Sequence, residues 1–318
     1  MSQYPLIVSI KRNSHEDGPG IRSVVFFKGC PLRCLFCHSP ESQNPKAEIT
    51  FQSRQCIKCG DCAKVCPEKA IDLNWPGRIH RDRCTLCGMC VQVCPGKGLR
   101  LVGTFYKIEE LTEILLRDYP FYHHSGGGVT LSGGECTLYP NYLHTLLHTL
   151  KATKIHLALE TSGYFDYATF RKKILPYLDL IYYDIKILNH KAHQQYTGRS
   201  NQRILDNFKR LVKEGVEVHA RIPVVPGITA TEENLSAIAG FLCKAGAKDV
   251  TLLPYNPLGF DMAEQLGRPK PDLPERFMTP SEEKAIENLV KTLLTVRSKL
   301  SLSATLPDLS LKAQTLCQ

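Results

Sequence analysis

Short apolar runs recur along most of the 318-residue chain and alternate with longer amphipathic stretches. The runs are rich in β-branched and aromatic side chains, as expected of strands that are buried on both faces. The predicted strands are Ser23–Lys28, Gly128–Leu131, Ile155–Leu159, Leu180–Tyr183, Val216–Ile222 and Val250–Leu253. The amphipathic stretches predict helices over Lys107–Asp118, Tyr139–Lys151, Asn201–Glu214 and Thr231–Ala245.

A last helix is predicted from a capping box, Thr279-Pro280-Ser281-Glu282, in which proline takes the first helical position. This helix should extend to about Leu300. Because strands and helices alternate, we expect a parallel sheet with right-handed crossovers. Six strands are too few for a closed eight-stranded barrel, so the pattern predicts an α/β fold with a partial (β/α)6 barrel.

Residues 49–103 interrupt this alternation, because they lack long periodic elements and are dense in cysteine, glycine and proline. They contain a direct repeat in which four cysteines recur after 28 residues. The two copies are Cys56, Cys59, Cys62, Cys66 and Cys84, Cys87, Cys90, Cys94. The sequence therefore predicts a small inserted domain over residues 49–103, with residues 1–48 and 104–318 forming the barrel.

Each copy of the repeat reads C-x2-C-x2-C-x3-C-P, the spacing of bacterial ferredoxins that hold [4Fe–4S] clusters. In that arrangement three cysteines bind one cluster and the fourth reaches the other cluster. The expected ligand sets are Cys56, Cys59, Cys62 and Cys94 for one cluster, and Cys84, Cys87, Cys90 and Cys66 for the other. Structural zinc also uses C-x2-C pairs, but zinc would not explain a third cysteine at the same spacing or the Cys-Pro ending.

Three further cysteines, Cys30, Cys34 and Cys37, directly follow the first predicted strand, where α/β barrels carry their chemistry. Three thiolates leave one iron of a cubane without a protein ligand, and an open coordination position can bind a substrate. The spacing, with Phe36 before the last cysteine, is typical of radical S-adenosylmethionine (SAM) enzymes. A third electron-transfer cluster or a zinc knuckle fits less well, because no fourth ligand lies nearby in the sequence.

Further motifs extend this interpretation along roughly residues 7–259. They are Asp17-Gly18-Pro19-Gly20-Ile21-Arg22, the run SGGGVTLSGGE from Ser125 to Glu135, Glu160-Thr161-Ser162-Gly163, Asp184-Ile185-Lys186, Tyr196-Thr197-Gly198 and the run RIPVVPG from Arg221 to Gly227. In these motifs the chain resembles the activating enzymes of glycyl radical enzymes. With its ferredoxin-like insert it is similar to the subgroup that activates glycyl radical lyases, decarboxylases and dehydratases.

The resemblance also implies which residues contact SAM. Gly133 and Gly134 would let the backbone approach the methionine amino group closely, and Lys186 would meet the SAM carboxylate. The expected contacts are Phe36, Cys37, His38, Gly133, Gly134, Glu135, Glu160, Asp184, Ile185, Lys186, Arg221 and Asn256. Strand alternation places Asp184 and Lys186 on one face, where a plain buried ion pair is the structural alternative. Asn256 stands where relatives commonly carry histidine, and no protein acid or base is expected.

The activity that the resemblance implies is reductive cleavage of SAM to a 5′-deoxyadenosyl radical, which abstracts hydrogen from a backbone glycine of a partner enzyme. The expected cofactors are three [4Fe–4S] clusters and SAM, with a flavodoxin or ferredoxin as electron donor under anaerobic conditions. The alternatives are a radical SAM enzyme that acts on a small molecule or RNA, and a ferredoxin that only transfers electrons. The last alternative would leave the barrel unexplained.

Net charge and hydropathy bear on whether the protein binds nucleic acid or a membrane. The formal net charge is +9, but three clusters with their thiolates would reduce it to about +4. Lysine and arginine are scattered rather than interleaved with aromatic residues, so we expect no nucleic acid. No run approaches the ~18 apolar residues of a membrane span, and the N-terminus lacks the pattern of a signal peptide. We therefore expect no membrane association and a cytoplasmic location.

Overall fold

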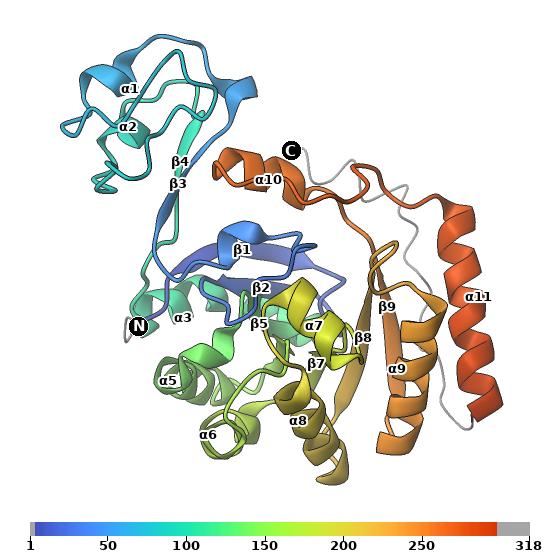
Figure 1. The fold of residues 1–318 in the computed structure, drawn as a ribbon. Helices are drawn as coiled ribbons and strands as arrows, with labels where there is room; N and C mark the ends of the chain where they lie inside the picture. Colours follow the sequence, from blue (N-terminus) through green and yellow to red (C-terminus); the bar gives the residue numbers. More distant parts are fainter. Residues whose placement is uncertain (1–3, 298–318) are drawn as a thin grey trace.

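A curved sheet of seven strands forms the centre of the computed structural model, which describes residues 4–297 (Figure 1). Its strands are β1 (Ile7–Ser14), β2 (Arg22–Phe27), β5 (Gly128–Gly133), β6 (His156–Thr161), β7 (Leu180–Asp184), β8 (Val218–Val224) and β9 (Asp249–Pro254). They lie in the order β1-β2-β5-β6-β7-β8-β9, and only the β1–β2 pair is antiparallel. The six predicted parallel strands and the partial barrel are confirmed. Within residues 4–297 the edge strands β1 and β9 do not pair, so the barrel is open.

Strand β1 was not predicted. Its sequence, IVSIKRNS, has polar and charged side chains at most of its exposed positions, so it shows no apolar run. It pairs with β2 along one edge only, and an edge strand can keep such a composition. The sheet therefore gains one antiparallel strand beside the six that alternate with helices.

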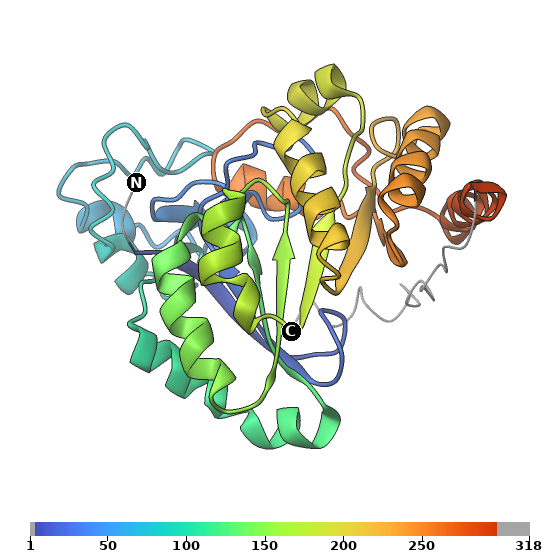
Figure 2. The same ribbon diagram turned by 90° about the horizontal axis from the view of Figure 1, so that it is seen from below.

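The helices cover the outer face of the sheet, as Figures 1 and 2 show for α3, α5, α6, α8 and α9. The helices after the insert are α3 (Ile108–Leu116), α4 (Tyr119–Ser125), α5 (Pro140–Lys151), α6 (Tyr167–Lys173), α7 (His190–Thr197), α8 (Gln202–Lys213), α9 (Glu232–Ala245), α10 (Gly259–Gln265) and α11 (Pro280–Arg297). The five predicted helices are confirmed within one or two residues at the ends that are described. The expected end of the last helix at Leu300 lies outside the described residues.

The capping box at the start of α11 is present. The Thr279 hydroxyl accepts a hydrogen bond from the Glu282 amide at 3.3 Å, and the Glu282 carboxylate accepts one from the Thr279 amide at 2.7 Å. The four short helices α4, α6, α7 and α10 were not predicted, because seven or eight residues give too little periodicity to recognise.

The inserted segment forms a separate small body that projects from the barrel (Figure 1). An antiparallel ribbon of β3 (Glu48–Phe51) and β4 (Leu99–Val102) leads into it and out of it. The segment also contains two single-turn helices, α1 (Asp61–Lys64) and α2 (Met89–Gln92). Its own core is small and consists of Ile49, Phe51, Ile79, Cys90 and Leu99. With so little apolar surface, the segment depends on other bonds to hold its loops.

None of the helices described is both long enough and apolar enough to cross a membrane.

Candidate functional site

The expected site residues gather at one edge of the sheet, where the parallel strands end. The cysteine loop follows β2, the Gly-Gly-Glu turn follows β5, and Glu160 lies near the end of β6. Asp184 is the last residue of β7, and its register partner on β8 is Arg221. Because parallel strands share the direction of their carboxyl ends, segments from distant parts of the sequence meet at this edge.

The loop of Cys30, Cys34 and Cys37 is held by elements of the barrel. The amide of Leu35 donates to the carbonyl of Tyr196 at 3.0 Å, and the amide of Arg33 donates to the carbonyl of Thr197 at 2.7 Å. Both acceptors lie at the end of α7. The motif Tyr196-Thr197-Gly198 thus supports the cysteine loop through its backbone.

The three cysteines of this loop are partly buried, and burial disfavours the negatively charged thiolate form of their side chains. Burial raises the pKa of Cys34 to about 12 and also raises the pKa values of Cys30 and Cys37. A set of clustered thiols can carry several negative charges here only if a cation balances them. This donor set fits an iron–sulfur cluster, whose iron supplies the balancing charge.

The glycine pair after β5 allows two backbones to lie in direct contact. Gly133 has φ +105°, and a Cβ there would collide with the backbone of Phe27. A Cβ on Gly134 would lie 2.6 Å from the carbonyl oxygen of Ser42 and against the carbonyl of Gly29. No other residue type fits at these positions without displacing the cysteine loop, since Gly29 directly precedes Cys30.

The side chain of Glu135 is fully buried. Its two oxygens accept hydrogen bonds from the hydroxyls of Thr137 and Thr161 and from both the amide and the hydroxyl of Ser162. The carboxylate therefore ties the end of β5 to the end of β6. The side-chain oxygens of Glu135, an expected SAM contact, are thus hydrogen-bonded inside the protein.

Glu160 and Arg221 form an ion pair across the mouth of the sheet. The other oxygen of Glu160 accepts a hydrogen bond from the Ser132 hydroxyl at 2.5 Å. The Arg221 guanidinium lies 3.6 Å from the ring centroid of Tyr182, and Arg221 is only 8% exposed. Although burial lowers the pKa of Arg221, the charges of Glu160 and Asp184 raise it above its ordinary value. The guanidinium is thus fixed as a cation.

Asp184 and Lys186 also pair, with 2.5 Å between Lys186 Nζ and Asp184 Oδ2. Burial lowers the pKa of Lys186, but the charge of Asp184 and its hydrogen bond to the ammonium group raise it well above the ordinary value. The ammonium group therefore stays charged. An anionic group that entered this space would find two fixed cations, Lys186 and Arg221.

The other residues that were expected to contact SAM differ in their burial and in their hydrogen bonds. Phe36 packs against the core, and His38 is exposed. Ile185 is buried, so only its backbone is available to a ligand. The Asn256 side chain accepts a hydrogen bond from the Leu258 amide at 3.0 Å, which shapes the turn after β9. Nearby, a Cβ on Gly259 would crowd the Cα of His38 at 2.8 Å, so α10 begins directly against the cysteine loop.

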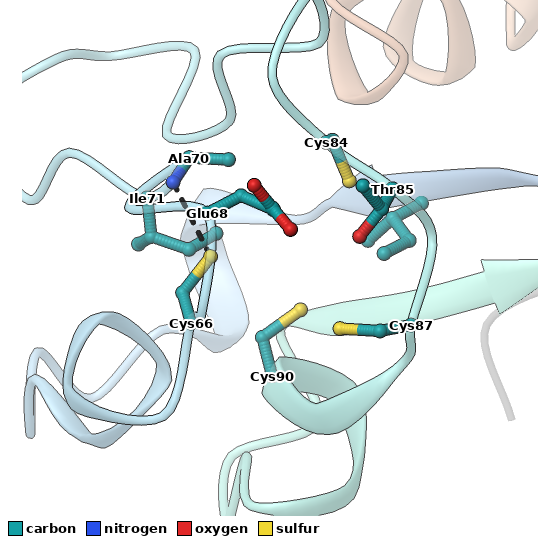
Figure 3. A pocket seen from close by; sticks show the side chains of 9 residues that line it. Cys66, Glu68, Ala70, Ile71, Cys84, Thr85, Cys87 and Cys90 are labelled. Atoms are coloured by element: carbon teal, nitrogen blue, oxygen red, sulfur yellow. Dashed lines mark hydrogen bonds between the residues drawn. The ribbon is translucent and has the colours of Figure 1, made fainter.

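The insert brings its eight cysteines together in two separate cavities. One is lined by Cys66, Cys84, Cys87 and Cys90, whose sulfur atoms point into a common space in Figure 3. We call this cavity the Cys84 site. The other, the Cys56 site, is lined by Cys56, Cys59, Cys62 and Cys94. Each cavity thus combines three cysteines of one repeat with the last cysteine of the other, the grouping expected from the spacing.

The two cavities have different surroundings. At the Cys84 site, the Ala70 amide donates to the Cys66 sulfur at 3.2 Å, and Glu68 lines the cavity. At the Cys56 site, the buried guanidinium of Arg78 lies 3.7 Å from the Cys56 sulfur and stacks over Phe51. The repeat gave no signal for Arg78, because it lies between the two copies. Ser132 and Tyr182 were also missed as site residues, although Ser132 belongs to the glycine-rich motif.

Of the other cysteines, Cys136 is fully buried in the main core. Cys243 packs against the same core. Cys317 lies outside the described residues.

Comparisons with known protein families match these parts of the chain. The family model of the radical SAM superfamily matches residues 81–237. A 4Fe-4S dicluster domain matches residues 55–97, and a 4Fe-4S single cluster domain matches residues 16–74, which include the Cys30 loop.

Several curated proteins are similar over most of their length. The trans-4-hydroxy-L-proline dehydratase activating enzyme of Clostridioides difficile is 39% identical over 288 residues, which cover 89% of this chain and 94% of that protein. The isethionate sulfite-lyase activating enzyme of Desulfovibrio desulfuricans is 40% identical over 277 residues, which cover 85% and 88%. The benzylsuccinate synthase activating enzyme of Thauera aromatica is 38% identical over 274 residues, which cover 84% and 83%.

Among solved structures, SuiB of Streptococcus suis bound to its precursor peptide SuiA has a TM-score of 0.55. Its sequence identity is 13%, and the match covers 90% of this chain and 49% of that one. This similarity concerns the fold alone.

Proposed function

The chain belongs to the activating enzymes of glycyl radical enzymes, within the radical SAM superfamily, and we propose how its residues divide the work of that activity. As a member of this family it uses SAM to generate a glycyl radical on a partner enzyme. The proposal assigns three [4Fe–4S] clusters, with Cys30, Cys34 and Cys37 holding the one that meets SAM. The observation that carries it is that this loop follows β2 against the Gly134 turn, at the same sheet edge as the charged residues Lys186 and Arg221.

Cys30, Cys34 and Cys37 would hold a cluster with one iron free of protein ligands, and this cluster would supply the electron for reductive cleavage of SAM to a 5′-deoxyadenosyl radical. The chain's own residues bind and orient the SAM molecule. Lys186 would provide the positive charge for its carboxylate, because its ammonium group stays charged beside Asp184 at the end of β7. The backbone of Gly133 and Gly134 would approach the SAM amino group, at a turn whose shape is set by close contact with the backbones of Phe27, Gly29 and Ser42.

Glu160 and Arg221 have a positioning task in this proposal. Their ion pair, extended by Ser132, connects β5, β6 and β8 across the mouth. This network keeps polar groups at fixed places around SAM, while Glu135 holds the two strand ends below it. We assign no protein side chain as an acid or base.

The insert, residues 49–103, would hold the other two clusters at the Cys84 and Cys56 sites. Both sites have four cysteines and no open position, which suits electron transfer rather than substrate binding. Cys59 and Cys87 are exposed, so each site reaches the protein surface. We propose that a flavodoxin or ferredoxin delivers electrons to the insert, which passes them to the catalytic cluster.

The decisive experiment combines iron analysis with detection of the product radical. After anaerobic reconstitution we expect about twelve irons per chain, four for each cluster. Candidate glycyl radical enzymes, incubated with the protein, SAM and a reductant, should show a glycyl radical by electron paramagnetic resonance (EPR) only with the cognate partner. About four irons, or zinc in place of iron, would refute the three-cluster assignment.

The named relatives act on different glycyl radical enzymes, so the panel of partners should include a hydroxyproline dehydratase, an isethionate lyase and a benzylsuccinate synthase. SAM cleavage without a radical on any glycyl radical enzyme, together with modification of a small molecule or RNA, would favour the alternative function.

A further inference from the structure

A charged junction joins the insert to the barrel at Glu48, the first residue of β3. One carboxylate oxygen of Glu48 lies 2.7 Å from Lys28 Nζ, and the other lies 2.6 Å from Arg268 Nη2. The Lys28 side chain is fully buried and also donates to the carbonyl of Glu41. Glu48 thus connects the insert to the end of β2, two residues before Cys30.

Helix α10 forms the second half of this junction. Arg268, which follows α10, donates to the Pro40 carbonyl at 2.5 Å in the segment after the cysteine loop. At its other end α10 begins at Gly259, against the backbone of Cys37 and His38. The helix therefore spans from the catalytic loop to the insert.

Arg81 also links the insert to the end of α10. Its guanidinium donates to the Ile49 carbonyl at 2.9 Å and to the Gln265 carbonyl, at the end of α10, at 3.0 Å. Arg81 precedes Cys84 by three residues, and Ile49 lines the Cys84 site. The bond to Gln265 therefore brings the end of α10 against the segment that leads to Cys84.

The Cys56 site lies at the other end of the ribbon. Glu48 pairs with Val102 at the barrel end of β3 and β4, whereas Phe51 pairs with Leu99 at the far end. Phe51 and Leu99 line the Cys56 site. The two cluster sites are therefore not equivalent with respect to the barrel.

We infer that Glu48 and Arg81 are positioning residues that hold the Cys84 site against α10 and the catalytic loop, which makes this site the last one before the catalytic cluster. The inference rests on the proposed electron relay. One electron from a reduced carrier protein enters at the Cys56 site, passes to the Cys84 site and leaves for the catalytic cluster. Each insert site is reduced and then reoxidised, and the carrier is oxidised by one electron.

The test compares Glu48→Gln and Arg81→Gln with the control Glu113→Gln. Glu113 also pairs with an arginine, Arg117, but it is 74% exposed on α3 and far from the junction in sequence. SAM cleavage is measured with a reduced ferredoxin and, separately, with dithionite, which can reduce the catalytic cluster directly. Misplacement should slow the ferredoxin-driven rate about tenfold and leave the dithionite-driven rate within about twofold of wild type.

Hydrogen–deuterium exchange of the protein without clusters gives a second readout. Both variants should exchange faster in residues 48–51 and 259–268, while β5 to β8 keep wild-type protection. Glu48→Asp, which keeps the charge, should recover part of the ferredoxin-driven rate. Faster exchange throughout the sheet, or equal slowing with both reductants, would overturn the inference because it would indicate a general folding defect.

A further variant separates this inference from the relay itself. Cys59→Ala with Cys87→Ala weakens both insert sites, and the relay predicts slow ferredoxin-driven cleavage in this variant. A normal rate there would refute the relay, and with it the inference. A slow rate there with a normal rate in Glu48→Gln and Arg81→Gln would refute only the positioning role.

Discussion

The cysteine loop of the barrel and the cysteine loops of the insert use similar spacings in different settings. The barrel loop supplies three cysteines, Cys30, Cys34 and Cys37, at the sheet edge that also carries the ion pairs of β6, β7 and β8. Each insert site has four cysteines and a small apolar core around it. The number of cysteines decides whether a coordination position stays open, and the surrounding charges decide what can occupy it.

The two regions also differ in what supports their loops. Backbone groups of α7 and the turns after β2 and β5 hold the catalytic loop, so its geometry depends on the whole barrel. The insert loops are held by their own helical turns and, in the proposed holoprotein, by the clusters themselves. A change in one region should therefore leave the chemistry of the other largely intact, and the following predictions test that independence.

The largest effect is expected from Cys34→Ala. Loss of a ligand from a three-cysteine site should abolish SAM cleavage and lower the iron content from about twelve to about eight per chain. Iron analysis and quantification of 5′-deoxyadenosine check the prediction. The matched variant Cys62→Ala should keep SAM cleavage with dithionite. If Cys34→Ala still produced 5′-deoxyadenosine, the catalytic loop would be wrongly assigned.

Gly134→Ala should have the second-largest effect. Its Cβ would lie 2.6 Å from the Ser42 carbonyl oxygen, so the backbone must shift, at a cost of about 3 kcal/mol. We expect a lower melting temperature and weak SAM binding, measured by calorimetry. The insert offers a control in Gly88, where φ is +78° but a Cβ meets nothing within 4 Å. Gly88→Ala should cost only about 1 kcal/mol and leave SAM binding unchanged.

Lys186→Ala should weaken SAM binding without removing iron. A charge-assisted hydrogen bond contributes about 1.5–3 kcal/mol, so the KM for SAM should rise about 10- to 100-fold. The variant also leaves Asp184 without its cation, which adds repulsion toward the SAM carboxylate. Lys151→Ala breaks an exposed pair with Asp179 and serves as the control. An unchanged KM for SAM in Lys186→Ala would show that Lys186 only forms a structural ion pair with Asp184 and does not bind SAM.

Arg78→Gln should have the smallest effect, confined to one half of the insert. A positive charge near Cys56 favours the more negative, reduced form of a cluster, so its removal should lower the reduction potential of that cluster by some tens of millivolts. For a one-electron reduction, about 59 mV corresponds to a tenfold change in the equilibrium constant. A redox titration followed by EPR measures the shift. The cluster at the Cys84 site should keep its potential, and an equal shift of both would show that the two sites share one electrostatic environment. Exposed Arg54→Gln is the control.

Much of the fold and of the candidate site could be predicted because the signals are local. Apolar runs predicted the six parallel strands and amphipathic periods predicted four of the helices, since strand and helix burial repeat at fixed intervals in the sequence. A capping box predicted the last helix. The 28-residue repeat of cysteines predicted the same crossed grouping of cysteines that lines the two cavities. The polar edge strand β1 and the short ribbon β3–β4 lacked such a signal, because their stability comes from pairing with a distant partner.

The sequence by itself determined the parallel α/β architecture, the position of the insert and the residue types that could bind metal. Only the tertiary structure decided that Glu135 is occupied by Thr161 and Ser162, and that Arg221 is fixed by Glu160 and Tyr182. The ion pairs of Glu48 with Lys28 and Arg268 are likewise visible only in the tertiary structure. The physical reason is the sequence separation of the interacting residues. Periodicity and ligand spacing involve residues within a few tens of positions of one another, whereas the partner of a buried charge depends on how the whole chain packs.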